Sequence, residues 1–122
     1  MDYDPLSAPD PESWMQLDEQ ERIALVLKHH ERAGAELPNA SLHAAMHAVV
    51  ENQLALSDDR VRQTLDRLLA EGLDRHDALH AISGVLAEQI WYAGQGEQGD
   101  ALSEGYYQGL TKLSAAKWRA AR

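Results

Sequence analysis

Residues Leu73–Trp91 read LDRHDALHAISGVLAEQIW, and this stretch predicts a buried helix. Asp74 holds the N-cap position, with Asp77 three residues later at the capping-box position. His76 and His80 are four residues apart and therefore point the same way, because an α-helix turns once in 3.6 residues. The apolar residues of the stretch recur at the spacing of one helical face: Leu79, Ile82, Leu86 and Ile90.

An earlier helix carries a second histidine pair with the same spacing, His43 and His47. Asn39 or Ser41 can cap this helix, which is expected to run to about Leu56. With six histidines placed at random, about 0.3 pairs would fall at the i, i+4 spacing, and the sequence has two. The repeated spacing near two helix starts therefore indicates that the pairs belong together.

Further helices are expected on either side of these two. Residues 1–10 form an irregular lead-in, and a short helical turn follows over Pro11–Met15 with Asp10 as its cap. A full helix begins at Asp18, where Glu21 completes a capping box. The remaining boundaries are a stop at Gly34, a break at Pro38, a helix from Ser57–Asp59 to Gly72, a glycine-rich loop over 94–99 and a fifth helix from Asp100.

The fold class that this pattern predicts is all-α, a bundle of four to five helices with short connections. No segment alternates between polar and apolar residues over a useful length, so no sheet is expected. A chain of 122 residues suits one core, and we assign residues 11–122 to a single domain after the lead-in. The inward residues expected outside the stretch above include Val26, His30, Leu42, Met46, Val49, Val61, Leu65, Leu68, Leu69, Leu102, Tyr106 and Leu110.

Composition narrows the classes of function. The chain has no cysteine, so disulfides and thiolate metal sites are excluded and any metal ligands must be histidines or carboxylates. Its net charge of −9 disfavours nucleic acid as a partner, because phosphates repel an acidic surface. No apolar run is long enough for a membrane span and no leader is recognisable, so a cytoplasmic location is expected.

Short loops make consecutive helices antiparallel, so the second and fourth helices begin at the same end of the bundle. His43 and His47 then lie at the same depth as His76 and His80, and His30, near the end of the first helix, comes to that end too. Neutral imidazoles from facing helices suit a divalent transition metal such as zinc, iron or nickel. Glu51 and Asp77 are possible additional ligands.

Another reading of the same residues stays open beside the metal hypothesis, because a hydrogen-bonded polar cluster would also explain the histidines. Within the metal hypothesis, the role of the ion is open as well. No nucleophile stands with a base at a recognisable spacing, which favours a structural or regulatory metal over catalysis.

Alternatives from other classes also follow from the residues. Arg75 and His80 form an R-x4-H pattern that resembles the motif of the HEPN superfamily of helical ribonucleases, which implies metal-independent cleavage of RNA. Alternatively, an apolar face carries a partner or a second copy of the chain, giving a homodimer. The residues expected on that face are Trp91, Tyr92, Tyr106 and Tyr107.

The stretch from His43 to Trp91 also resembles a small bacterial family of all-helical proteins known only as a domain of unknown function. The shared pattern is L-H-x3-H, then Q-L, then H-x-A-x-H, then L-A-E-x-I-W. Its residues in this chain are Leu42, His43, His47, Gln53, Leu54, His76, Ala78, His80, Leu86, Ala87, Glu88, Ile90 and Trp91. The resemblance implies that the histidine pairs form one unit, and it implies no particular activity.

Overall fold

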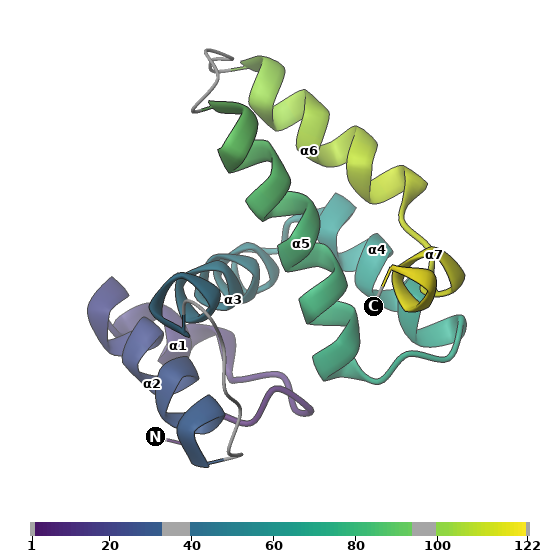
Figure 1. The fold of residues 1–122 in the computed structure, drawn as a ribbon. Coiled ribbons are helices and arrows are strands. Elements are labelled where there is room, and N and C mark those ends of the chain that lie inside the picture. Colours follow the sequence, from purple (N-terminus) through teal and green to yellow (C-terminus); the bar gives the residue numbers. More distant parts are fainter. Residues whose placement is uncertain (1, 33–39, 94–99, 122) are drawn as a thin grey trace. The chain divides into compact units, whose positions relative to one another are not determined.

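The computed structural model describes residues 2–32, 40–93 and 100–121, and this part of the chain forms seven α-helices and no β-strand (Figure 1). The predicted all-α fold is confirmed. The chain divides into two compact units, Met1–Asp58 and Asp59–Arg122, and each is described by itself. The assignment of residues 11–122 to one domain stays a prediction. Within the described ranges, no helix combines the length and apolar character needed to cross a membrane.

Three helices make up the first unit: α1 (Pro11–Gln16), α2 (Glu19–Arg32) and α3 (Ala40–Ala55). α3 contacts both of the others. The buried apolar residues at the centre of this unit are Tyr3, Trp14, Val26, Ala44 and Ala48. The Trp14 side chain is completely buried, and its indole N–H donates to Asn52 Oδ1 at 2.8 Å. α1 is thereby fixed to α3 through a polar contact as well as through packing.

The predicted caps of α1 and α2 are confirmed. Asp10 accepts a hydrogen bond from the backbone N–H of Ser13 at 3.0 Å, and this bond lowers the pKa of the Asp10 carboxyl below its ordinary value. At the start of α2, the N–H of Glu21 donates to Asp18 Oδ1 at 2.8 Å, while the N–H of Asp18 donates to Glu21 Oε1 at 3.2 Å. These two reciprocal bonds are the capping box that the sequence predicts.

The guanidinium of Arg22 closes the C-terminal end of α1. It donates to the backbone oxygens of Trp14 at 3.1 Å, Met15 at 3.0 Å and Leu17 at 2.6 Å. A further bond of 3.2 Å reaches Asn52 Oδ1. The last carbonyls of a helix have no partner within the helix, and a cation suits that end electrostatically. Arg22 therefore joins α1, α2 and α3 through one side chain.

The buried face of α3 differs from the predicted one. Leu42 is 50% exposed, and Met46 and Val49 are only partly buried. The residues that are buried are Ala44, His47, Ala48, Val50, Glu51 and Leu54. Apolar residues surround nearly the whole of this helix, so its periodicity does not select a face. The side of α3 that carries His47, Val50 and Leu54 therefore faces inward.

The second unit contains α4 (Asp59–Ala70), α5 (Arg75–Ala93), α6 (Asp100–Lys112) and α7 (Ala115–Ala120). α5 and α6 are antiparallel neighbours, and α4 contacts both (Figure 1). The buried core of this unit includes Val61, Leu65, Leu68, Leu79, Ile82, Tyr106 and Leu110, as the sequence predicts. Leu69 and Ile90 are instead 38% and 48% exposed. Ile90 lies eight residues after Ile82, which places it about 80° around the helix from that buried side chain.

α7 is not among the predicted helices. Ser114 caps it by accepting a bond from the N–H of Lys117 at 3.1 Å. Because the third helical position holds lysine instead of Glu or Gln, the capping signal is incomplete. Glu71 Oε1 accepts from the N–H of Ala115 at 2.8 Å, and this bond lowers the pKa of the Glu71 carboxyl. The contact comes from 44 residues away, so local sequence does not reveal it.

The turn between α4 and α5 follows the prediction. Gly72 has a φ of 103°, the conformation that favours glycine after a helix.

Arg67 donates to the backbone oxygens of Leu110 at 2.8 Å and Leu113 at 2.5 Å, at the end of α6. The predicted boundaries at Gly34, Pro38, Asn39 and 94–99, and the side chains of Tyr92 and Leu102, lie outside the described residues.

Candidate functional site

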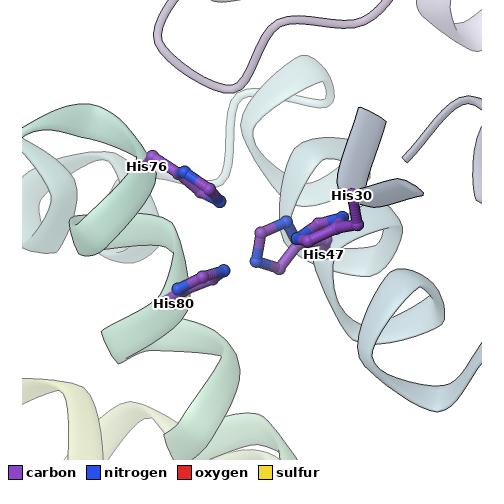
Figure 2. Close-up of side chains that lie close together, drawn as sticks. All are labelled: His30, His47, His76 and His80. Carbon is purple, nitrogen blue, oxygen red and sulfur yellow. The ribbon is translucent and has the colours of Figure 1, made fainter. Parts of the chain in front are cut away.

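Four histidines of the first unit lie close together. His29 and His30 belong to the last turn of α2, and His43 and His47 belong to α3. The His30 ring centroid is 4.8 Å from that of His43 and 5.1 Å from that of His47. His43 and His47 are 4.6 Å apart, as expected for residues on successive turns of one helix. Figure 2 shows the rings of His30 and His47 beside each other.

The buried His30 imidazole is oriented by the backbone of its own helix. Its Nδ1 lies 2.8 Å from the carbonyl oxygen of Val26, and His30 is 4% exposed. A carbonyl oxygen only accepts hydrogen bonds, so Nδ1 carries the proton and Nε2 of the neutral ring carries a lone pair. A carbonyl bond to the other ring nitrogen is the usual arrangement of a metal-bound histidine. His30 is thus prepared to ligate through Nε2.

His47 is fully buried, and a carboxylate lies one turn further along α3. Glu51 is 1% exposed, and its Oε2 accepts a hydrogen bond from the Tyr3 hydroxyl at 2.5 Å. Tyr3 is itself buried, with its ring edge-on to His29 at 6.2 Å between centroids. Sequence reasoning placed Glu51 among the possible ligands and missed Tyr3. No spacing rule connects a residue of the lead-in with one 48 positions later.

The second unit carries the other histidine pair. His76 and His80 lie in the first turns of α5, with ring centroids 4.3 Å apart and half-buried side chains. Both rings project from the same side of the helix in Figure 2. The predicted cap holds this end of α5, since the N–H of Asp77 donates to Asp74 Oδ1 at 2.8 Å. The half-buried Asp77 remains a possible carboxylate ligand.

Each unit therefore offers two imidazoles at a spacing that suits one ion. Within the pair His30 and His47, and within the pair His76 and His80, a ring nitrogen of one residue lies within 4.8 Å of a ring nitrogen of the other. Two nitrogens bound to the same tetrahedral zinc, each at about 2.0–2.1 Å, are somewhat closer than this, and small rotamer changes cover the difference. The chemistry of the donors is also suitable, because neutral imidazole is a good ligand for zinc, iron and nickel.

The second unit also contains the residues on which the ribonuclease and docking hypotheses depend. Arg75 and His80 are five residues apart on α5, about 140° of rotation, so they do not share a helical face within one chain. Tyr106 is 5% exposed and belongs to the core. Tyr107 lies under the Arg60 guanidinium, 4.4 Å from its ring centroid, whereas Trp91 is 61% exposed. Only Trp91 among these described aromatic residues is openly on the surface.

Comparison with known proteins identifies a family but no activity. The family model described as "Domain of unknown function (DUF1841)" matches residues 7–112. No curated protein and no solved structure matches the chain. The matched range includes all six histidines and most of both units.

Proposed function

We propose that this protein, which belongs to the DUF1841 family, binds one divalent transition metal ion through two pairs of histidine ring nitrogens: His30 and His47, and His76 and His80. In this proposal each unit supplies two ligands. Four imidazoles form a closed tetrahedral shell, which is typical of structural or regulatory ions and not of hydrolytic ones. Zinc, iron and nickel all suit this donor set.

The observation that carries the proposal is the buried pair His30 and His47. Their ring centroids are 5.1 Å apart, and two neutral imidazoles at this spacing suit one divalent transition metal ion. The bond from His30 Nδ1 to the Val26 carbonyl already fixes the tautomer that ligates. Glu51 adds a buried carboxyl group one helical turn from His47, and carboxylate oxygen is a further ligand that zinc accepts.

His30 takes the place that the sequence alone gives to His43. Both rings lie about equally far from His47, and the bond from His30 Nδ1 to the Val26 carbonyl is the observation that supports His30 as a ligand. His43 is then a neighbour that packs on the two ligands. The two assignments make opposite predictions for the metal affinity of His30→Ala and His43→Ala.

The test begins with elemental analysis of the purified, untagged full chain and a titration with zinc, iron and nickel. The proposal predicts about one equivalent of metal and a higher melting temperature when it is bound. Ligand present at about 100 times its Kd stabilises the folded state by about 2.7 kcal/mol. A chain that holds no metal and takes up none of the three ions contradicts the proposal.

Alanine variants then identify the ligands. His30→Ala, His47→Ala, His76→Ala and His80→Ala should each weaken metal binding at least tenfold. His29→Ala is the matched control, since His29 neighbours His30 on the same turn and is not a proposed ligand. Loss of binding in His43→Ala with retention in His30→Ala would restore the ligand set expected from the sequence. Equal retention in all variants would refute the site.

A further inference from the structure

A groove crosses the surface of the second unit between α5, α6 and α7. Its volume is about 960 Å³. Small residues form much of its floor: Ala81, Gly84, Gly105 and Gly109. A Cβ added at Gly109 would lie 2.7 Å from Val85 Cγ1, so α6 approaches α5 closely there. A Cβ at Gly84 would meet nothing within 4 Å, so the backbone of α5 is open to an approaching element at this point.

The two ends of the groove carry opposite charges. Glu88 and Glu104 line one end, where the last part of α5 runs beside the first part of α6. Lys112 and Lys117 line the other end, and all four side chains are exposed. Glu104 and Lys112 are eight residues apart on α6, about 12 Å along its axis. The groove is therefore a surface with an acidic half and a basic half.

A large exposed side chain stands beside the acidic end. Trp91 is 61% exposed and follows Gly84 by seven residues, which puts it within about 20° of the same helical face. Tryptophan is enriched in protein interfaces and often contributes much of their binding energy. At the opposite end, the half-buried Trp118 and the exposed Lys117 border the groove.

We propose that a second copy of this chain docks on this groove, related by a two-fold axis that passes near the middle of the α5 segment from Gly84 to Glu88. Two-fold symmetry brings the acidic end of each copy to the basic end of the other, so both charge contacts are attractive. Trp91 lies about five residues after the point where the axis crosses α5. The two-fold axis therefore places Trp91 against the partner copy at the residue five positions before that point, Ala81. That position is the end of the groove which carries Lys117 and Trp118, where an indole finds an apolar wall and a cation.

The inference is independent of the proposed metal, and its test keeps the two apart. Sedimentation equilibrium of the full chain is measured over a wide range of concentrations, with a chelator present throughout. The wild-type chain should dimerise. Glu88→Lys and Lys117→Glu should each raise the dimer Kd at least tenfold, because each places like charges across both contacts. Trp91→Ala should weaken the dimer to a similar degree while its thermal melt stays that of the wild type.

The decisive sample is an equimolar mixture of Glu88→Lys and Lys117→Glu. In the mixed dimer the reversed charge at position 88 of one copy faces the reversed charge at position 117 of the other, and the second contact keeps its natural charges. The mixture should therefore dimerise although neither variant does alone. Arg62→Glu and Asp66→Lys, exposed charge reversals on α4 outside the groove, are matched controls and should leave the Kd unchanged. A monomeric wild-type chain, or a mixture as weakly associated as its components, overturns the proposal.

Discussion

Truncation of Arg22 should destabilise the first unit far more than an ordinary change of a half-buried residue. The side chain donates to three backbone carbonyls at the end of α1 and to Asn52. A hydrogen bond to a charged group contributes about 1.5–3 kcal/mol net. If water replaces the guanidinium at about half of the four acceptors, two bonds at the lower value give a loss of about 3 kcal/mol for Arg22→Ala.

The assay is urea unfolding followed by tryptophan fluorescence. Of the three tryptophans only Trp14 belongs to the first unit, so Trp91→Phe and Trp118→Phe give a background in which the signal reports that unit. Arg22→Lys keeps the charge but loses the planar fork of donors, and it should lose about 2 kcal/mol. The matched control Arg62→Ala removes an exposed arginine of α4 and should change the free energy of unfolding by less than about 0.5 kcal/mol. A loss below about 1.5 kcal/mol for Arg22→Ala, the lower value for a single bond of this kind, would refute the role assigned to this side chain.

Three further predictions concern single contacts. Tyr3→Phe removes the hydroxyl that donates to the buried Glu51 and should lower the free energy of unfolding by about 1–3 kcal/mol; an unchanged urea midpoint would contradict this. Gly72→Ala places a Cβ on a backbone with φ of 103° and should lower the free energy of unfolding by about 1–2 kcal/mol, with an unaltered melting temperature as the contrary result. The bond from the Ala115 N–H lowers the pKa of Glu71, so its stabilisation is complete above the ordinary value of 4.5 and is lost as pH falls through the lower folded-state pKa. Glu71→Gln should therefore melt earlier than the wild type at neutral pH, and the gap should narrow in acid; a gap that widens in acid would contradict the sign.

The sequence predicts most of the fold because its local signals agree with one another. The Asp18–Glu21 capping box, the Asp74 cap and the positive φ of Gly72 all appear where the pattern places them. Prediction fails where the choice depends on partners distant in the chain. Apolar residues lie around nearly the whole of α3, so its sequence does not indicate which face is buried. The N-terminus of α7 is bound by a glutamate 44 residues earlier in the chain.

Likewise, the sequence predicts only part of the candidate site. The spacing of His43 and His47, and of His76 and His80, is enough to predict two imidazole pairs, and each pair is close in the structure. The approach of His30 to His47 joins α2 to α3, and the Tyr3–Glu51 bond joins the lead-in to α3. Neither contact has a periodic signature, because both depend on how the helices of the first unit pack.

The central claim is that imidazoles hold one metal ion, and X-ray absorption at the zinc edge of the zinc-loaded chain tests it most directly. The account predicts a first shell of four nitrogens at about 2.0–2.1 Å, with the outer-shell scattering that imidazole rings produce. A shell of oxygens without imidazole scattering would contradict the account.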